Sequence, residues 1–332
     1  MSDAPVRIGV VGAGSLGYHH VRLLRELPGA RLAGFHEASA ERAARVSSEL
    51  GVAAVENLDA LLDAVDAVTI VVPTPAHFEV ARRALERGVH VMIEKPITTT
   101  LEEADELLAI ARRCGALVQT GHVERFNRAI RAALPHIRAP LFVESNRLAP
   151  FNPRGSDVAV VLDLMIHDID LVRTLVRGQV TALAAAGVPV LTPSIDIANA
   201  RLGFDSGAVA NITASRVSRE RVRKLRIFQR SGYLSLDLAQ GTGEFFRLRG
   251  DVDVEALAAA PRQIEEYMER VPLAAPEGEP LRLELASFLA AVRGDEPVLV
   301  SGEDGREALA LALRIMREIE RALPALAESP RA

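Results

Sequence analysis

Three side chains that can bind or transfer protons stand at helical spacing in one otherwise apolar stretch. The stretch covers residues 157–170, and Asp163, His167 and Asp170 occupy positions i, i+4 and i+7 within it. Residues at this spacing share one face of a helix. A carboxylate one turn before a histidine can orient the imidazole and stabilise its charged form, so the pattern indicates general acid–base catalysis. The alternative is an internal hydrogen-bond network without a catalytic role, because buried polar groups need partners.

The apolar residues of the same stretch predict the helix that must carry these side chains. Ser156 or Asp157 is placed to cap its first turn. The residues that recur at helical spacing are Val158, Val161, Leu162, Met165, Ile166 and Ile169.

A glycine-rich loop follows the first apolar strand of the chain. The strand covers residues 7–11, a helical pattern covers residues 18–27, and between them stands G-x-G-x-x-G. Gly12 allows a tight turn, Gly14 lets the backbone approach a pyrophosphate, and Gly17 lets the helix pack on the strand, with the phosphate at the helix N-terminus. The dinucleotide-binding loop that we expect consists of Gly12, Gly14, Ser15, Leu16 and Gly17.

Glu37 follows the second predicted strand, residues 30–35, and stands 20 residues after Gly17. A carboxylate at this place can bind the ribose hydroxyls of a dinucleotide. Because it would also repel a 2′-phosphate, the sequence favours NAD over NADP. Ser39 and Arg42 nearby keep NADP as an alternative.

Strands and helices alternate through the first 120 residues. After the second strand, the expected strands are residues 67–72, 90–93 and 117–120, and the expected helices are residues 41–50, 58–62, 78–87 and 101–114. This alternation predicts a doubly wound parallel sheet in an α/β fold. Loops at the carboxyl ends of its strands should line the ligand crevice. Among the residues at these ends are Pro73, Thr74, His77, Glu94 and Lys95, which we expect to contact the cofactor, and residues 121–127.

Lys95 lies between an apolar strand and Pro96, beside Glu94, at the place where the nicotinamide should lie. A lysine at a strand end is usually a solvated charge. An ammonium group in this position can instead polarise or deprotonate a substrate hydroxyl next to the carbon that loses hydride. We therefore expect Lys95 to act in catalysis.

The second half of the chain has a different pattern. Residues 198–204 and 208–215 alternate apolar and polar side chains around a turn, which predicts a hairpin with one buried face. Residues 262–278 form a polar connector, and residues 283–292 and 306–323 form amphipathic helices.

Seven basic residues crowd between these elements, against the single acid Glu220. They can hold a nucleotide diphosphate or the carboxylates of a neighbouring subunit, and the alternative is a solvated surface. The residues are Arg216, Arg219, Arg221, Arg223, Lys224, Arg226 and Arg230.

Length and composition limit the class of protein. With 332 residues the chain can form two domains. We assign residues 1–121 to a cofactor domain and residues 122–332 to a substrate and oligomerisation domain, with C-terminal helices that can pack back on the first.

A net charge of −5 argues against nucleic acid and membrane surfaces as partners. The lone Cys114 excludes an internal disulfide and a multi-cysteine metal site, and we expect no metal. Without a leader pattern or a transmembrane run, we expect a cytoplasmic protein.

Four motifs together resemble the glucose–fructose oxidoreductase and inositol dehydrogenase (Gfo/Idh/MocA) family. They are residues 12–17, Pro-Thr-Pro-Ala-His at 73–77, Glu-Lys-Pro at 94–96, and Asp-x-x-x-His-Asp-x-Asp at 163–170. The resemblance implies a Rossmann domain followed by an α/β domain with a large, open, mostly antiparallel sheet. It also implies a nicotinamide-dependent reaction at a sugar or cyclitol hydroxyl.

The same resemblance assigns roles to single residues. It implies that Lys95 and His167 are the catalytic pair, that Asp163 binds or orients the substrate hydroxyl, and that the Lys95–Pro96 peptide bond is cis. Which of Lys95 and His167 accepts the proton stays open.

Residues 121–127 and 157–170 are more narrowly similar to UDP-N-acetylglucosamine 3-dehydrogenases. This similarity implies oxidation of C3 of a UDP-sugar to a ketone that a partner aminotransferase converts to an amino sugar for lipid A or a surface polysaccharide. It also implies a homodimer or homotetramer formed through the C-terminal sheet. The alternatives are a dehydrogenase of another sugar or of inositol, and a non-catalytic nicotinamide-binding regulator. The substrate-binding residues that we expect are Lys95, His122, Glu124, Arg125, Asn127, Asp163 and His167.

Overall fold

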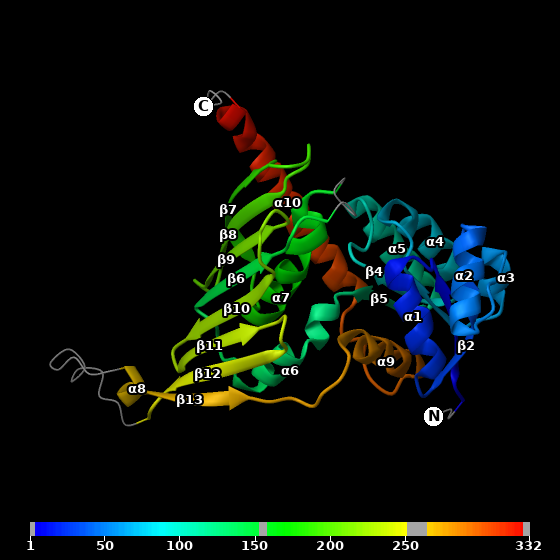
Figure 1. Cartoon of the computed structure of the whole chain (residues 1–332), viewed down its shortest axis with the longest axis horizontal. Coiled ribbons are helices and arrows are strands. Elements are labelled where there is room, and N and C mark those ends of the chain that lie inside the picture. The colour runs from blue at the N-terminus through cyan, green and yellow to red at the C-terminus, as the bar shows by residue number, and fades with distance from the viewer. Residues whose placement is uncertain (1–3, 153–157, 251–263, 328–332) are drawn as a thin grey trace. The chain divides into compact units, whose positions relative to one another are not determined.

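The computed structural model of the protein describes residues 4–152, 158–250 and 264–327 (Figure 1). The chain is organised in two compact units. One consists of residues 1–123 and 278–310, and the other of residues 124–277 and 311–332. Each unit is built around one sheet.

The first unit contains a five-stranded parallel sheet with the strand order β2-β1-β3-β4-β5. Its strands are β1 (Val6–Val11), β2 (Ala30–His36), β3 (Ala67–Ile70), β4 (His90–Glu94) and β5 (Val118–Gly121). The connecting helices are α1 (Ser15–Glu26), α2 (Ala40–Leu50), α3 (Leu58–Asp63), the 3-10 turn η1 (Thr74–Ala76), α4 (His77–Leu85) and α5 (Leu101–Cys114). The predicted alternation of strands and helices is confirmed, as is the parallel sheet.

Local sequence explains the ends of α5, which are those predicted. The hydroxyl of Thr100 accepts a hydrogen bond from the N–H of Glu103, and the Glu103 carboxylate accepts one from the N–H of Thr100. This reciprocal arrangement satisfies two N–H groups that the first helical turn leaves without partners. Gly115 ends the helix in the left-handed conformation, with φ of 67°.

A late segment of the chain completes the core of the first unit. Leu285 and Phe288 of α9 (Pro280–Arg293) pack with Ile8, Leu24 and Phe35 in one buried cluster. After α9, the chain runs along the edge strand β5, where the N–H of residue 120 donates to the carbonyl of residue 300. The helix α10 (Gly302–Ala327) begins directly after this pairing.

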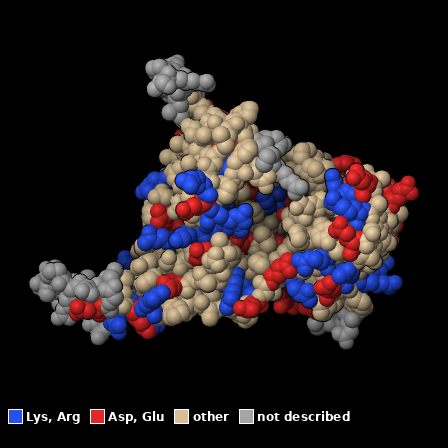
Figure 2. All heavy atoms as spheres, in the orientation of Figure 1, with Lys and Arg blue, Asp and Glu red and all other residues tan. Residues whose placement is uncertain are grey.

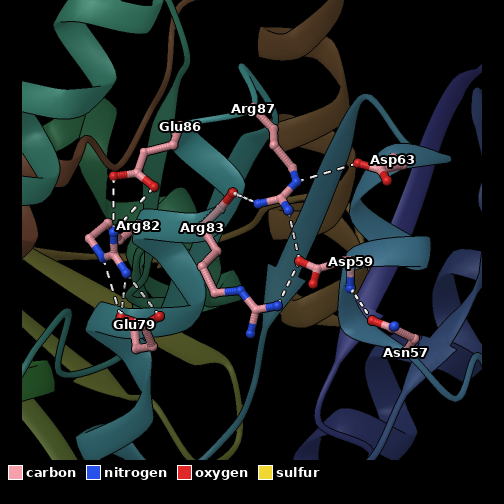
Figure 3. Close-up of polar contacts among 8 residues, drawn as sticks. All are labelled: Asn57, Asp59, Asp63, Glu79, Arg82, Arg83, Glu86 and Arg87. Carbon is pink, nitrogen blue, oxygen red and sulfur yellow. Dashed lines mark hydrogen bonds and ion pairs between the residues drawn. The ribbon is translucent and has the colours of Figure 1, made fainter.

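Ion pairs join α3 and α4 on the surface of the first unit (Figure 3). Asp59 accepts from Arg83 at 2.6 Å and from Arg87 at 2.8 Å, and Asn57 caps the start of α3. Within α4, Arg82 lies between Glu79 and Glu86. These side chains are largely solvent-accessible, so each pair contributes little to stability.

The second unit contains an eight-stranded sheet with the order β13-β12-β11-β10-β6-β9-β8-β7. All neighbouring strands are antiparallel except β6 and β9, which are parallel. The open, mostly antiparallel sheet implied by the family resemblance is therefore confirmed. The strands are β6 (Phe142–Leu148), β7 (Val180–Val188), β8 (Ile197–Phe204), β9 (Val209–Ser215), β10 (Val222–Gln229), β11 (Gly232–Asp237), β12 (Thr242–Leu248) and β13 (Met268–Leu273).

One face of this sheet is covered by helices. The buried residues Val143, Ile227, Leu234 and Phe245 lie opposite one another across four neighbouring strands and so share that face. The short helix α6 packs on β11 and β12, and α7 packs on β6 and β9. The helical segments before β7 are η2 (Val123–Phe126), α6 (Arg128–Ala133), η3 (Leu134–His136), the π-helical turn η4 (Val161–Met165) and α7 (Ile166–Val176).

The predicted hairpin is confirmed as β8 and β9, but the polar connector expected over residues 262–278 is wrong for residues 268–273. These residues form β13, which pairs with β12 along its whole length. The segment was missed because its pattern is short and polar and contains a proline. Its pairing relies on the backbone and on cross-strand ion pairs from Arg247 to Glu269 and from Arg270 to Glu244. Residues 262 and 263 lie outside the described residues.

Candidate active site

The glycine-rich loop connects β1 to α1, and its glycines serve different purposes. Gly12 has φ of 91°, and a Cβ atom there would lie 2.7 Å from the carbonyl oxygen of Val71. A Cβ atom at Gly17 would collide with the Gly12 carbonyl. At Gly14, by contrast, a Cβ atom would meet no atom within 4 Å. Packing within the protein thus explains Gly12 and Gly17, whereas the space beside Gly14 fits a ligand that approaches the backbone.

This loop fits the pyrophosphate of a dinucleotide. No side chain caps α1, whose N-terminal residue is Ser15, so its first N–H groups are available to an anion, and the helix dipole favours negative charge there. Ser15 and Leu16 are both exposed on this first turn.

Glu37 lies against the same loop. One carboxylate oxygen accepts the N–H of Ala13 at 2.8 Å, and the other accepts the N–H of Ser39 at 2.9 Å and Nη1 of Arg42 at 3.0 Å. Burial alone would raise the pKa of Glu37, but these hydrogen bonds outweigh it and lower the pKa. The carboxylate is therefore ionised at neutral pH, next to the backbone that would hold a dinucleotide.

The segment after β3 is tied to the segment after β4 by His77. Its buried ring lies 2.9 Å from the carbonyl oxygen of Val72 and 2.9 Å from that of Pro96. Burial lowers the pKa of His77 despite these contacts, so the neutral ring can donate its one N–H to only one of the two carbonyls. Pro73 and Thr74 lie between Val72 and His77 in the chain, and η1 begins at Thr74. We expected His77 to contact the cofactor, and its contacts show a role in holding these two loops together.

Lys95 follows β4 and is half-buried, and its peptide bond to Pro96 is cis, as the resemblance implied. The neighbouring Glu94 is buried. One of its carboxylate oxygens lies 3.3 Å from Nε2 of the fully buried His20, and the other accepts the N–H of Lys95 at 3.3 Å. Glu94 therefore fastens the backbone of Lys95 to α1. His122, directly after β5, is fully buried.

In the second unit, the expected regular helix over residues 157–170 begins instead with a π-helical turn. Asp163 lies within η4, and His167 lies in the first turn of α7. The predicted cap at residues 156–157 lies outside the described residues. A π-helical turn holds more residues than an α-helical turn, so the simple i, i+4 geometry does not apply between Asp163 and His167. Such single turns occur frequently at functional sites. Both side chains are half-buried.

Asp170 does not belong with these two residues, contrary to the expected shared face. It is fully buried and pairs with Arg125, at 2.8 Å from Nε and 2.5 Å from Nη2. The alternative interpretation of a satisfied internal network is therefore correct for Asp170. Sequence spacing missed this because the partner comes from η2, far away in the chain.

A second buried ion pair involves Asp168. Nε of Arg147 lies 2.5 Å from one Asp168 oxygen, and the hydroxyl of Ser145 donates to the other at 2.7 Å. Nη1 of Arg147 also donates to Glu124 at 2.8 Å, and Asn127 donates to Glu124 at 2.9 Å. Burial alone would lower the pKa of Arg147, but Asp168 and Glu124 raise it above its usual value. The network was not expected from the sequence.

These two ion pairs fix the rotation of α7 around its axis. Successive residues of an α-helix are turned by roughly 100°. Asp168 therefore projects on one side of His167 and Asp170 on the other, and each is held by an arginine. The direction of the His167 side chain is set by both pairs.

The contacts of η2 change the roles of three residues expected to bind substrate. Arg125 and Glu124 are committed to the buried pairs described above. The side-chain oxygen of Asn127 accepts the N–H of Ala129 and caps α6, while the side-chain amide nitrogen donates to Glu124 and to the carbonyl of Leu238. These contacts hold η2 in place beside α7. A direct contact between any of the three residues and the substrate stays a prediction.

The start of η4 is held by residues that the sequence did not reveal. The N–H of Val160 donates to the carbonyl of Ile195 at 2.9 Å, and Arg216 donates to the carbonyl of Val158. Arg216 also lies 3.7 Å from the buried Asp196. One Asp196 oxygen accepts three consecutive N–H groups, from residues 190–192.

Among the described residues, no three His, Cys, Asp or Glu side chains come together in a way that could hold a metal ion. Within the same residues, no helix has the length and apolar character needed to cross a membrane.

Asp196 should make stability depend on acid. Burial alone would raise its pKa, but the N–H and hydroxyl donors lower it to about 2. Because the pKa is lower in the folded state, the stabilisation is complete above the unfolded value of about 3.9 and is lost as the pH falls toward 2. We expect Asp196→Asn to lower the free energy of unfolding by about 2 kcal/mol at neutral pH.

Urea unfolding between neutral pH and pH 2 measures this effect. The difference between wild type and Asp196→Asn should shrink as acid is added, and the exposed Asp205 provides the control Asp205→Asn. A difference that stays constant down to pH 2 would show that the Asp196 charge is not the cause.

The first unit and much of the second match known families. Residues 6–122 match the family described as "Oxidoreductase family, NAD-binding Rossmann fold". Residues 136–235 match the "GFO/IDH/MocA C-terminal domain".

One curated relative matches 95% of the chain and another matches about two thirds of it. A UDP-N-acetylglucosamine 3-dehydrogenase of Acidithiobacillus ferrooxidans is 39% identical over 316 residues, which are 95% of this chain and 97% of the relative. A scyllo-inositol 2-dehydrogenase (NAD(+)) of Bacillus subtilis is 31% identical over 64% of this chain and 68% of its own length.

A solved structure is similar over nearly the whole chain. The UDP-N-acetylglucosamine 3-dehydrogenase GnnA from Acidithiobacillus ferrooxidans superposes with a TM-score of 0.86 at 37% identity, covering 95% of this chain and 98% of that chain. The family matches and the relatives together identify the present protein as an oxidoreductase that uses a nicotinamide cofactor. The chain belongs to the Gfo/Idh/MocA oxidoreductase family.

Proposed function

We propose that this protein is an NAD-dependent dehydrogenase that oxidises the C3 hydroxyl of UDP-N-acetylglucosamine to a ketone. The observation that carries the proposal is the 39% identity, over 95% of the chain, to an enzyme named for that reaction. The relatives named as inositol dehydrogenases are less similar, and the one described above matches only 64% of the chain. Residues 1–121 would bind the cofactor, and residues 122–332 would bind the substrate and form the oligomer.

The residues expected to bind the cofactor support NAD. The ionised Glu37 carboxylate can accept hydrogen bonds from ribose hydroxyls, and it disfavours the 2′-phosphate of NADP. Arg42 is already paired with Glu37, which leaves it a poorer partner for that phosphate. The nicotinamide of a bound NAD accepts the hydride.

Lys95, Asp163 and His167 would carry the proton chemistry. Either Lys95 or His167 removes the hydroxyl proton as hydride leaves the same carbon, and Asp163 orients the hydroxyl. A non-catalytic role as a regulator is less consistent with this complete set of residues.

Lysine is rare in this chain, which supports a role for Lys95 in proton transfer. Only Lys95 and Lys224 are lysines among the 39 Lys and Arg residues. Arginine stays charged at all physiological pH values, whereas a lysine amine can lose its proton. A sequence that uses arginine almost everywhere has a lysine at the place where proton transfer is expected.

The product and partners follow from this chemistry. A 3-keto sugar nucleotide is a substrate for transamination, so a partner aminotransferase would convert it to a 3-amino sugar for lipid A or a surface polysaccharide. We propose a cytoplasmic enzyme, because NAD and nucleotide sugars are cytoplasmic metabolites.

The uncovered face of the second sheet supports a homodimer or homotetramer. Phe142, Phe228, Tyr233 and Phe246 form a ladder on that face across four strands, with ring centroids 4.7 to 5.9 Å apart. Aromatic side chains are enriched in the cores of protein interfaces. The ladder would lie at the contact between subunits.

The function is tested with a panel of UDP-N-acetylglucosamine, free N-acetylglucosamine, UDP-glucose and myo-inositol with NAD. We expect the highest kcat/KM for UDP-N-acetylglucosamine. With substrate deuterated at C3 the label should pass to the reduced cofactor, and with substrate deuterated at C4 it should not. Turnover of myo-inositol without turnover of any UDP-sugar would overturn the proposed substrate.

Glu37→Ser should weaken the preference for NAD. Removing the charge should reduce discrimination against NADP by roughly 1–3 kcal/mol, the scale of a hydrogen bond to a charged group. The measurement is the ratio of kcat/KM for the two cofactors. Glu41→Gln, an exposed acid at the start of α2, is the control. A ratio unchanged by Glu37→Ser would remove Glu37 from cofactor selection.

Lys95→Met should lower kcat by about a hundredfold or more, the scale of a positioned acid or base. Calorimetric titration should show NAD binding close to that of wild type. Lys224→Met removes the only other lysine of the chain and should leave kcat unchanged. Near-normal turnover by Lys95→Met would exclude Lys95 from the mechanism.

A further inference from the structure

The basic run over residues 216–230 is divided between the two faces of the second sheet by β10. Leu225 and Ile227 are fully buried on the helix-covered face. Arg223 lies on the same face, because it stands two residues before Leu225 in the strand. Lys224 and Arg226 lie on the uncovered face, where Arg226 lies over the Phe228 ring at 5.4 Å. The run is therefore not one patch. Figure 2 shows Lys and Arg side chains gathered over the part of the sheet where Figure 1 draws β6, β9 and β10.

Arg223 lies in a place that carries excess positive charge. In the strand register it stands opposite Arg147, on the same face of the sheet. Its Nη1 lies 3.5 Å from the Glu124 oxygen that Arg147 already binds at 2.8 Å. Burial lowers the pKa of Arg223, and the nearby Arg147 and Arg221 lower it further. The guanidinium groups of Arg147, Arg221 and Arg223 outnumber the carboxylates of Glu124 and Asp168 that offset them.

Arg221 adds a further guanidinium to this place. It is exposed, stands directly before β10, and shares the alternation of Arg223. Within the part of the chain that the structure describes, no carboxylate lies within ion-pair distance of Arg221. Among the other members of the run, Arg216 is buried against Asp196 and Arg230 lies in the turn at the far end of β10.

This surplus lies close to the residues that would act on the sugar. Arg147, opposite Arg223, binds Asp168, and Asp168 is the neighbour of His167 in the chain. In a sugar nucleotide the diphosphate is attached to C1 of the sugar, two carbons from C3. A subsite for the diphosphate must therefore lie near the side chain of His167, and Arg223 is connected to that part of α7 through Arg147 and Asp168.

We propose that Arg221 and Arg223 form the subsite that binds the diphosphate of a sugar nucleotide. The inference rests on the proposed function and assigns the part of the substrate that a free sugar or an inositol lacks. Guanidinium groups bind phosphate oxygens through two parallel hydrogen bonds, which gives both affinity and orientation. The bound diphosphate offsets the excess charge around Arg223, and the ion pairs of Arg147 stay intact.

Arg221→Gln and Arg223→Gln test the subsite, with Arg230→Gln as the matched control. Arg230 belongs to the same basic run and is exposed at the opposite end of β10. The first readout is the dissociation constant of UDP, which carries the diphosphate without the reacting sugar, measured by calorimetry. The second is KM for UDP-N-acetylglucosamine, with kcat and the KM for NAD measured alongside.

We expect each substitution to raise the UDP dissociation constant and the KM for UDP-N-acetylglucosamine by about tenfold to a hundredfold, as for a lost hydrogen bond to a charged group. The kcat value and the KM for NAD should change much less. Arg223→Lys should retain part of the affinity, and Arg230→Gln should match wild type. Because Arg221 is exposed, Arg221→Gln tests the proposal even where Arg223→Gln lowers thermal stability.

The outcomes separate this inference from the proposed function. Wild-type turnover of UDP-N-acetylglucosamine with unchanged UDP affinity in both variants would overturn the subsite and leave the function standing. When no sugar nucleotide is turned over, the proposed function fails, and titration with UDP and pyrophosphate still decides the subsite. Loss of their binding in Arg221→Gln supports the subsite, and wild type without affinity for either anion overturns it.

Discussion

The guanidinium of Arg147 is the point through which the second unit holds α7, the helix that carries His167. It is almost wholly buried and binds Asp168 of α7 and Glu124 of η2, while Ser145 of the same strand completes the partners of Asp168. A buried ion pair of this kind contributes little net stability over apolar packing, but removing one partner leaves a buried charge that costs roughly 3–5 kcal/mol. The network therefore serves to fix geometry. It allows one rotation of α7, which gives His167 one direction.

The two units use different means to position the side chains that we propose to react. In the first, a parallel sheet places loops at the carboxyl ends of its strands, and short polar contacts from Glu94 and His77 fix the segment around Lys95. In the second, Asp163 lies in the π turn η4 and His167 lies in the helix that follows it. Buried charged residues hold the chain on both sides of this turn. Asp196 and Arg216 hold the segment that leads into the turn, and Arg147 holds the helix that follows it. A buried charged side chain can hold a segment in place only when its polar atoms have hydrogen-bond partners. Asp196 accepts hydrogen bonds from the N–H groups of three consecutive residues.

The sequence predicted the first sheet closely because its signals are local. Glycine spacing, a capping box and alternation each act over a few residues, and α5 has the predicted ends. The second unit was less predictable, because its defining contacts join distant segments. Asp170 looked catalytic by spacing, yet its partner Arg125 comes from a different element. The π turn cannot be seen in a periodic pattern, and β13 is held by its neighbour strand more than by its own sequence. The roles of Lys95, Asp163 and His167 are inferred from their chemistry and from the family resemblance.

The parallel pairing of β6 with β9 has a consequence for how the protein reaches its folded state. All other neighbours in that sheet are antiparallel, but Phe142 pairs with Val209, and η4, α7, β7 and β8 lie between them in the chain. Contacts between segments so far apart form slowly, because a long loop must close before they gain any stability. The two strands on which α7 packs are these same two strands. Helix α7, which carries His167, can therefore complete its packing only after this slow closure, so catalytic activity should be one of the last properties to appear during refolding.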